Sequence, residues 1–307
     1  MAACRHRSLA LTLLPLRQAA GRPEESLAGK PEGAGEFVPV PPVVGIPGPL
    51  FFETPTLTFV PKGTIRVTAG VRWLNEVEYP YSGLSGDLAQ LPVVRVDVGF
   101  GSRIEVRVQG AARQRLRIDW DASDVHPPAE VSGDATADAG DFSVVTIAQV
   151  MPERGWKAAF GLRVEVKLPN TSEKAGIGTN TTDVLLSVPA QKRLGRLVFN
   201  SDVGVGILTQ PTSAQRQTDV LLYGLAAAYE ASPAWMLSAE VNGRWTSSGG
   251  KPGTGNHSTV RMGASWSTGP VAVGLVLSRG FGEGGERFGG LLAVSYGFRI
   301  YDRVRAE

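Results

Sequence analysis

The chain has 307 residues, and its 31 Lys and Arg nearly balance its 29 Asp and Glu, which leaves a formal charge of +2. This balance gives no indication of a nucleic-acid partner. No apolar run reaches the length of about 18 residues that a membrane-spanning helix needs. The single cysteine, Cys4, excludes an internal disulfide and a cysteine-based metal site.

The first 20 residues have the composition of a secretory signal peptide. Arg5 and Arg7 precede a short apolar run at 8–16, and Arg17 follows before any clear cleavage site. A positive segment followed by an apolar one is typical of such signals. We therefore predict a signal peptide in residues 1–20, with a disordered arm or a misassigned start as the alternatives.

Residues 21–63 are rich in Pro, Gly and Glu. This composition is typical of an extended linker, and we predict a periplasmic leader. Two apolar stretches, Phe51-Phe52 and 56–60, leave open a second interpretation, in which they add a short strand or plug the lumen of a barrel. At the other end, residues 301–307 form a tail after the last predicted strand.

The segment 156–168 alternates between two kinds of residue without a break. Every second residue from Ala158 to Leu168 is apolar, whereas the intervening positions include Arg163, Glu165 and Lys167. Successive side chains of a strand point to opposite faces, so this segment has one apolar and one charged face. It is longer than the usual strand of a globular protein, which has about 5 or 6 residues.

The same alternation continues along most of the chain and predicts twelve strands. They span 64–78, 91–100, 103–120, 140–151, 156–168, 183–193, 196–208, 218–230, 235–246, 258–267, 270–280 and 288–300. An even number of strands returns both termini to the same side, as in bacterial barrels. The predicted fold class is all-β: a twelve-stranded antiparallel transmembrane β-barrel over residues 64–300, with short periplasmic turns and longer extracellular loops.

The lengths of the connections support this fold. Those after the even-numbered strands are short, at 101–102, 152–155, 194–195, 231–234 and 268–269. Those after most odd-numbered strands are longer and polar, notably 121–139 and 246–257, although the last one at 281–287 is short. Short turns on one rim and longer loops on the other are typical of outer-membrane barrels.

Aromatic residues lie next to the predicted short turns, on the apolar side of their strands. They are Phe100, Trp156, Tyr229, Trp235, Trp266 and Phe298. Amphipathic rings favour the headgroup level of a bilayer, so we predict that these residues mark one membrane interface. Trp73, Trp120 and Trp245 lie toward the opposite strand ends and are candidates for the other interface. The alternative is that all these rings form the core of a soluble barrel.

The opposite face of the strands carries charges of both signs. Because buried charges are costly, this face must be wet or mutually paired. Two interpretations remain open: an Arg-rich selective pore for anions or polar solutes, and a salt-bridge lattice that fills a closed barrel. For the lumen and its constriction we select Arg107, Arg117, Arg163, Glu165, Lys167, Glu240, Arg244 and Arg261.

Catalytic, cofactor and metal sites are not predicted. The three histidines, His6, His126 and His257, are far apart, and the latter two fall in predicted loops. No predicted strand carries a histidine next to a serine, as a hydrolase triad would need. The G-x-G-x-x-G pattern at 280–285 is followed by no helix, so it is interpreted as a hairpin and not as a phosphate site.

Several short motifs resemble one family of bacterial outer-membrane barrels, the MetA-pathway-of-phenol-degradation family. They lie at 61–65, 140–145, 162–169, 178–184, 192–195, 228–233 and 278–282. The resemblance implies a transporter-like barrel over roughly 54–300, and the family provides no binding residues to carry over. Two features depart from its pattern: Asn170-Thr171 follows the Leu-Pro, and the chain continues past Phe298.

We therefore predict a channel in the outer membrane of a Gram-negative bacterium that passively conducts a small aromatic or anionic solute. Its expected partners are outer-membrane lipids, the solute and the barrel-assembly machinery, with no nucleic acid and no cofactor. One alternative is a non-transporting structural or surface-binding barrel that acts through its loops, chiefly 121–139. Another is a soluble periplasmic barrel.

Overall fold

The structure is a computed structural model that describes residues 38–39, 51–119, 131, 133–210, 213–247 and 252–300. For residues 38–39 and 213–215 only the backbone is described. All of these residues belong to one compact unit, 35–307. The predicted signal peptide, most of the predicted leader before residue 51, the tail 301–307 and His126 lie outside the described residues.

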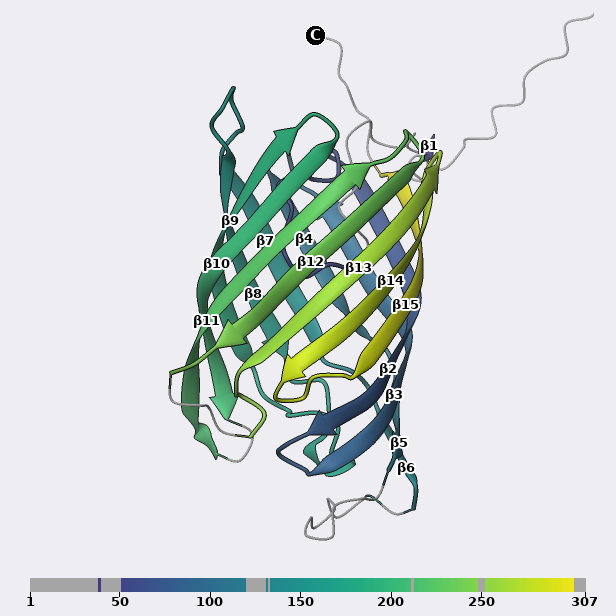
Figure 1. Ribbon diagram of the computed structural model, residues 1–307, viewed down its shortest axis with the longest axis vertical. Coiled ribbons are helices and arrows are strands. Elements are labelled where there is room, and N and C mark those ends of the chain that lie inside the picture. Colours follow the sequence, from purple (N-terminus) through teal and green to yellow (C-terminus); the bar gives the residue numbers. More distant parts are fainter. Residues whose placement is uncertain are drawn as a thin grey trace, which may run out of the picture. The chain divides into compact units, whose positions relative to one another are not determined.

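Twelve antiparallel strands form a closed barrel, as predicted. Figure 1 shows the strands inclined to the barrel axis. The strands are β2 (Thr64–Tyr79), β3 (Leu84–Gly99), β4 (Ile104–Ala111) continued by β5 (Gln114–Ile118), β6 (Ala135–Asp138) continued by β7 (Phe142–Met151), β8 (Ala159–Leu168), β9 (Asp183–Leu194), β10 (Leu197–Gln210), β11 (Ser213–Glu230), β12 (Trp235–Trp245), β13 (His257–Thr268), β14 (Val271–Gly282) and β15 (Phe288–Arg299). Closure follows from the pairing of β15 with β2, in which Arg299 lies opposite Thr64. A two-residue strand, β1 (Val38–Pro39), pairs with the end of β15.

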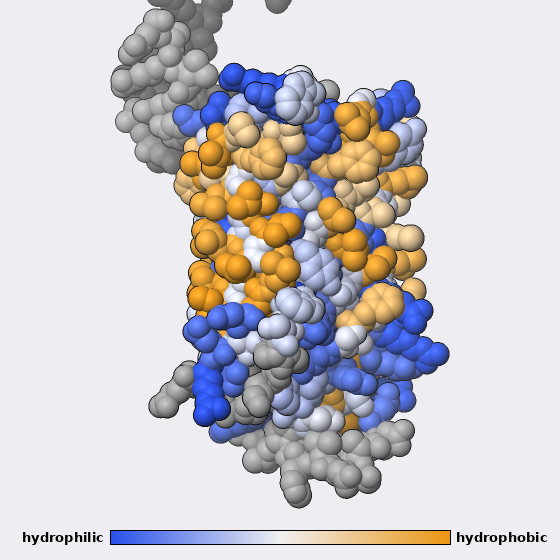
Figure 2. Space-filling view, turned by 60° about the vertical axis from the view of Figure 1, so that its left-hand side comes forward, coloured by the Kyte–Doolittle hydropathy of each residue, from blue (hydrophilic) through white to orange (hydrophobic). Residues whose placement is uncertain are grey.

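Alternation along each strand separates an apolar outer face from a polar inner face. In β8 the side chains of Phe160, Leu162 and Val164 are exposed, whereas Arg163 and Glu165 are buried inside the barrel. Figure 2 shows the result on one side of the molecule, where a hydrophobic band lies between two hydrophilic ends. The period-two pattern of the sequence is therefore the physical origin of this wall.

The two rims of the barrel have different connections. The rim that holds the start of β2 and the end of β15, here the turn rim, has its connections at 100–103, 152–158, 195–196, 231–234 and 269–270. The opposite rim, here the loop rim, has its connections at 80–83, 119–134, 169–182, 211–212, 246–256 and 283–287. Loop 169–182 contains a short 3-10 helix, η1 (Glu173–Ala175).

Two loops that we expected to be long are short, because the strands on either side continue farther. Strand β3 begins at Leu84 and not at 91, so the first connection on the loop rim is only 80–83. Strand β11 begins at Ser213 and not at 218, so the connection before it is only 211–212. Polar residues of these stretches, such as Asp87 and Gln90, lie on strands and not in loops.

Near the loop rim, three neighbouring strands reverse the set of alternate residues that points into the barrel. The pairing of β2 with β3 shifts by one residue between Gly70 and Arg72 and again between Leu74 and Val77. The third strand is interrupted at 112–113, between β4 and β5. Each extra residue is a β-bulge, and one residue is enough to turn every following side chain to the other face. Beyond these bulges, β2 after Asn75, β3 before Leu91, β5 and β6 form two hairpins that we call the loop-rim hairpins.

The loop-rim hairpins are apolar inside and charged outside. Val77, Leu84, Leu88, Leu116 and Ile118 form a buried cluster, which Ile177 of loop 169–182 completes. Arg113, Arg115, Arg117 and Asp119 are exposed on the outer surface. Loop 169–182 therefore folds against the inner side of the hairpins.

Candidate functional site

The barrel lumen contains a segment of the chain's own N-terminal part, residues 51–60, here the luminal segment. Phe51 and Phe52 are only 3% and 2% exposed, and Leu57 and Val60 are also buried. Phe51 and Phe52 pack in one cluster with residues of the wall, namely Val93, Ala111, Ala226, Val276, Leu291 and Ala293. We expected these residues in an extended leader. Their position corresponds instead to the second interpretation, in which they plug the lumen.

Side chains of the wall hold the luminal segment by its backbone. Glu240 accepts hydrogen bonds from the amides of Glu53 and Thr54, at 3.3 Å for Glu53. The side chain of Gln191 accepts from the amide of Leu57 at 2.8 Å. Among the described residues, no backbone–backbone hydrogen bond joins the luminal segment to a strand. The segment is therefore held by a few side chains and is not a thirteenth strand.

Two further contacts anchor the ends of the luminal segment. Glu105 accepts a hydrogen bond from the Val60 amide at 3.0 Å. Arg95 donates to the carbonyl of Phe52 at 3.2 Å, and its guanidinium lies 4.9 Å from the centre of the Phe51 ring. Such a charged group over a ring face is attracted by the quadrupole of the ring.

Glycines of the wall make room for the luminal segment. A Cβ atom on Gly224 of β11 would lie 2.5 Å from the side-chain oxygen of Thr54. A Cβ atom on Gly161 of β8 would lie 2.7 Å from Leu57 and equally close to the carbonyl oxygen of Ala148 in the neighbouring strand. Real Cβ atoms essentially never approach so closely, so the wall is shaped for this segment.

Most charges of the lumen are paired. On the turn-rim side, Asp97 lies between Arg66 at 3.0 Å and Arg107 at 2.7 Å, and Arg107 also pairs with Glu105 at 3.0 Å. All of these side chains are largely buried. The pairing lowers the cost of placing them away from bulk water.

A second group of pairs lies around the middle of the lumen. Arg163 pairs with Glu165 and, at 3.1 Å, with Asp202. Arg261 pairs with Glu240 at 3.0 Å, so the carboxylate that holds the luminal segment is itself held by the wall. Nearer the loop rim, Lys167 pairs with Asp183 at 2.7 Å and lies 3.6 Å from Asp141.

Seven of the eight residues selected for the constriction face the lumen, but at different levels and not in one ring. They are Arg107, Arg163, Glu165, Lys167, Glu240, Arg244 and Arg261. Arg244 lies at the loop-rim end, where it donates to the carbonyls of Gly255 at 2.9 Å and Gly253 at 3.2 Å.

The eighth selected residue, Arg117, was assigned to the wrong face. It is exposed on the outside of β5, as is Arg115. The break at 112–113 shifts the alternation by one residue, so Gln114, Leu116 and Ile118 take the inward positions.

His257 also differs from expectation, because it is the first residue of β13 and not part of a loop. Its ring nitrogens contact the carbonyl of Glu283 and the hydroxyl of Thr259, both at 3.0 Å. No group of three or more His, Cys, Asp or Glu side chains suited to a metal occurs in the described part of the chain.

The aromatic residues selected for a membrane interface lie on the outer surface near the turn rim. Phe100, Trp156, Tyr229, Trp235 and Trp266 are exposed, Trp156 to 85%, whereas Phe298 is half-buried. Trp235 and Trp266 lie directly opposite each other on β12 and β13. At the other end of the outer face, Trp73 packs edge-on against Phe288 at 6.1 Å.

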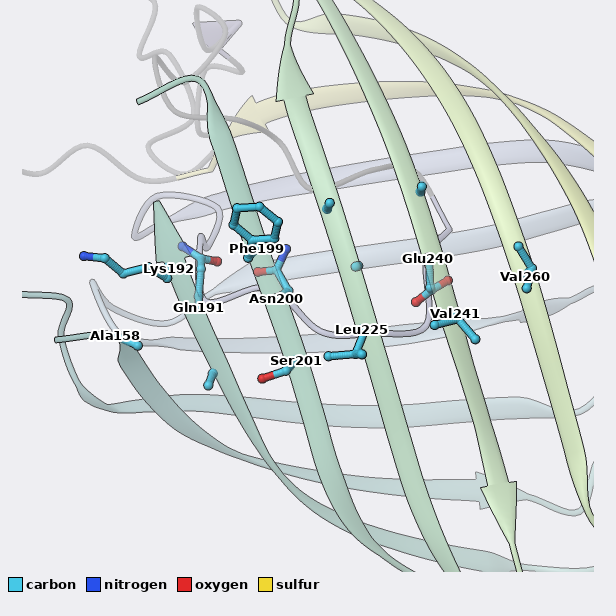
Figure 3. A pocket seen from close by; sticks show the side chains of 14 residues that line it. Ala158, Gln191, Lys192, Phe199, Asn200, Ser201, Leu225, Glu240, Val241 and Val260 are labelled. Carbon is cyan, nitrogen blue, oxygen red and sulfur yellow. The ribbon is translucent and has the colours of Figure 1, made fainter. Parts of the chain in front are cut away.

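Three cavities are relevant to the site. Two small ones, of about 210 and 190 Å³, lie in the lumen beside the luminal segment, and Glu53 and Glu165 border both. A larger hollow of about 530 Å³ lies over β9–β13 (Figure 3). Because it is lined mainly by outward-facing apolar residues such as Phe199, Leu225 and Val241, it is not part of the lumen.

Loop 169–182 narrows the lumen at the loop rim. Tyr81 donates a hydrogen bond to the carbonyl of Gly178 and accepts one from its amide at 3.2 Å. Ser82 donates to the carbonyl of Gly176 at 2.7 Å, and Gln114 donates to that of Ile177 at 3.0 Å. Burial, together with nearby carboxylates, raises the pKa of Tyr81 to about 12 although its hydrogen bond to Gly178 opposes the shift.

Comparisons with known proteins define the fold. No family model matches the chain, and no curated protein matches it. Among solved structures, an outer membrane channel from Pseudomonas putida F1 is similar over 80% of this chain and 100% of that chain, with a TM-score of 0.58 and 16% identity. The fold is therefore that of an outer-membrane β-barrel.

Two other solved structures are similar at a lower level. The NanC porin covers 78% of this chain with its full length, at a TM-score of 0.47 and 7% identity. The CymD monoaromatic hydrocarbon channel covers 79% of this chain with 90% of its own, at a TM-score of 0.39 and 12% identity. These values are too low to add to the description of this protein. The family resemblance of the sequence motifs therefore rests on those motifs alone.

Proposed function

We propose that the protein is an outer-membrane channel of a Gram-negative bacterium through which a small solute diffuses, and that its luminal segment closes it in the conformation described. The observation that carries this proposal is the construction of the lumen. A charged inner wall surrounds a segment whose hydrogen bonds to the wall, among the described residues, all involve a side chain, and the ion pairs within the wall do not include the segment. Removal of the segment would therefore leave a polar passage and not a row of broken strand contacts.

Placement in a membrane is supported by the outer surface. Its apolar band faces hydrocarbon in this proposal, and the exposed aromatic side chains near the turn rim lie at the periplasmic headgroup level. Outer-membrane lipids and the barrel-assembly machinery are then its partners. A soluble periplasmic barrel would expose this band to water, at a cost of roughly 25 cal/mol for each Å².

The unpaired cations of the lumen favour anionic solutes. Arg72, Arg95 and Arg244 form no ion pair with any described residue, whereas the acids Asp97, Glu105, Glu165 and Glu240 all lie beside an arginine. The lumen as a whole carries charges of both signs, but these three guanidinium groups are local positive centres that would attract an anion. This is the basis for proposing an anion over a cation as the solute.

The closed lumen equally favours a second candidate, a non-transporting structural or surface-binding barrel. The two differ in whether the luminal segment leaves the lumen. The three atoms nearest to a Cβ atom at Gly224 all belong to Thr54, so Gly224→Val should displace the segment before it disturbs the wall. Gly290→Val is the matched control, because a Cβ atom there meets nothing within 4 Å.

Single-channel recording in planar bilayers separates the two candidates. We expect brief or rare openings from the unmodified protein and from Gly290→Val. Openings of Gly224→Val should be at least tenfold more frequent. Anions should carry most of that current. The heat-dependent gel mobility of each protein shows whether its barrel is folded. If all three proteins are folded and none conducts, the structural barrel is favoured.

A further inference from the structure

We propose that the wall around Phe51 and Glu53 is a binding site for a small aromatic carboxylate, and that the luminal segment occupies it as an internal ligand. This inference rests on the proposed channel and names the solute class that its lumen selects. The ring of Phe51 takes the place of the aromatic group of the solute, and the carboxylate of Glu53 takes the place of its charge.

The first support is an apolar niche in a lumen that is otherwise charged. Phe51 and Phe52 are nearly fully buried against side chains from β3, β4, β11, β14 and β15. Several of these side chains are small, including Ala111, Ala226 and Ala293, so the wall leaves room for an aromatic ring at this position. A niche of this kind has no use in a salt-bridge lattice, whereas it gains binding free energy from any aromatic group that leaves water.

The second support is the cation next to this niche. Arg95 is buried, and its side chain contacts Gln109 at 3.0 Å, the carbonyl of Phe52 and the face of the Phe51 ring. No carboxylate among the described residues lies within ion-pair distance of it. A buried guanidinium without a carboxylate is costly, and its planar fork suits a carboxylate in two-point contact.

The third support is the position of Glu53. Its carboxylate borders both luminal cavities and lies in the electrostatic field of Arg72, Arg95, Arg163 and Arg261. Its one hydrogen bond among the described residues comes from Gln109 at 3.5 Å, the outer limit of such a bond. The segment thus supplies the negative charge that the arginines require, but it holds that charge loosely.

The fourth support is the backbone of Phe51, which has a φ of +61°. An L-residue other than Gly, Asn or Asp rarely adopts this left-handed conformation, and it persists only where the surroundings enforce it. The strain is released when the segment leaves. A free solute with the same ring and charge would bind without it, so it can compete with the tethered segment.

The test uses the full chain with Phe51→Ala and Phe52→Ala together, which empties the niche while Arg95 remains. The probes are benzoate, acetate as a carboxylate without a ring, and benzyl alcohol as a ring without a charge. Titration calorimetry in detergent should give at least tenfold tighter binding of benzoate than of either other probe. Unmodified protein should bind benzoate at least tenfold more weakly than the double variant, because the segment competes.

Two further variants make the result specific to Arg95. Adding Arg95→Gln to the double variant should abolish the preference for benzoate over benzyl alcohol, and Arg95→Lys should restore part of it. Adding Arg117→Gln on the outer surface should change nothing. Equal binding of benzoate and acetate, or a preference that survives Arg95→Gln, would overturn the proposal.

A second route does not depend on the folding of the double variant. Gly224→Val keeps both phenylalanines and should displace the segment through its steric contact with Thr54, so it too should bind benzoate more tightly than Gly290→Val does. Conductance without a benzoate preference would remove this inference and leave the channel standing. Benzoate binding by a barrel that does not conduct would contradict the proposed channel and leave the binding site standing.

Discussion

The barrel wall and the loop-rim hairpins are built from the same strands but have opposite polarity. In the wall, β3 and β4 direct Arg95, Asp97 and Arg107 inward, whereas Ile104 and Val108 are exposed outside. In the hairpins, the continuations of these strands direct Leu84, Leu88 and Leu116 inward and Arg115 and Arg117 outward. A single strand therefore passes through two environments, and the bulges mark the boundary between them.

The comparison shows what each region is built to do. The wall has a face for hydrocarbon and a face for water or paired charges, as a barrel that crosses a bilayer needs. The hairpins have a charged face for water and an apolar face for loop 169–182, as an ordinary small sheet with a hydrophobic core has. The hairpins are thus a cap with a solvated outer face on a barrel whose outer face is apolar, and substitutions should affect the two regions by different rules.

The largest effect should come from a charge in the apolar core of the cap. Leu116 is 0% exposed, and Leu116→Asp removes its packing and buries a carboxylate without a partner. Loss of the leucine alone costs about 2–5 kcal/mol in a packed core, and the charge adds to this cost. We expect loop 169–182 to become a site of rapid proteolysis while the barrel still shows heat-dependent gel mobility.

Arg115→Asp on the outer side of the same strand is the control. It should change the proteolysis rate by less than about twofold, because that position is solvated. If both variants were cleaved at the same slow rate as the unmodified protein, the hairpins would have no core of their own.

The next effect should come from the paired charges of the wall. Asp97→Asn leaves Arg66 and Arg107 next to each other with one neutral oxygen between them. Removal of one partner of a buried pair costs about 3–5 kcal/mol, and access of luminal water should reduce this to about 2 kcal/mol. Urea unfolding of the barrel in detergent micelles measures the change.

The matching pair joins Glu76 of the cap to Arg287 of the connection 283–287, and these side chains are 51% and 69% exposed. Glu76→Gln should cost no more than about 0.5 kcal/mol, because exposed pairs are weak. Equal costs for Asp97→Asn and Glu76→Gln would contradict a buried network in the wall.

The sequence alone predicts the wall well, because its signal is local. Phe160, Leu162 and Val164 alternate with Arg163 and Glu165 within one strand, and the structure has these faces as predicted. The bulges are harder, since the pattern before Leu91 and the pattern after Pro92 are each regular and differ only by one residue in phase. Pro92 is the one local sign of the change, because proline is confined to edges and bulges of sheets.

The luminal segment was less predictable for a different reason. Its anchors join residues that are very distant in the chain, such as Thr54 and Glu240, which are 186 positions apart. Phe51-Phe52 in a Pro- and Gly-rich stretch indicates burial somewhere, but no local pattern says against which strands. Gly224 and Gly161 have their reason only in the folded barrel, where each faces the segment.

A smaller effect is expected at the contact between Tyr81 and loop 169–182. Tyr81→Phe removes the hydrogen bonds to Gly178 and should weaken the docking of the loop by about 1 kcal/mol, seen as about fivefold faster proteolysis. The folded pKa of Tyr81, about 12, lies above the ordinary value of 10.0. Its contribution should therefore be complete below pH 10 and decline as the pH rises from 10 toward 12.

Comparison of the unmodified protein with Tyr81→Phe from pH 7 to 12 isolates the contribution of the phenol group to the docking of the loop. The difference in cleavage rate between unmodified protein and Tyr81→Phe should be constant from pH 7 to 9 and shrink above pH 10. A difference that stays constant up to pH 12 would mean that the phenol group does not hold the loop.

The smallest effect should come from Arg117, and it tests where the bulges place this residue. Arg117→Gln on the outer surface of the cap should change stability by less than about 0.5 kcal/mol and leave the ion selectivity of the proposed channel unaltered. Arg163→Gln is the counterpart in the wall, because it leaves Glu165 and Asp202 without their shared cation. That variant should lose about 2 kcal/mol and shift the selectivity of a Gly224→Val channel toward cations. If Arg117→Gln changed selectivity as much as Arg163→Gln did, both arginines would face the lumen, and the one-residue shift at 112–113 would be absent from the protein in the membrane.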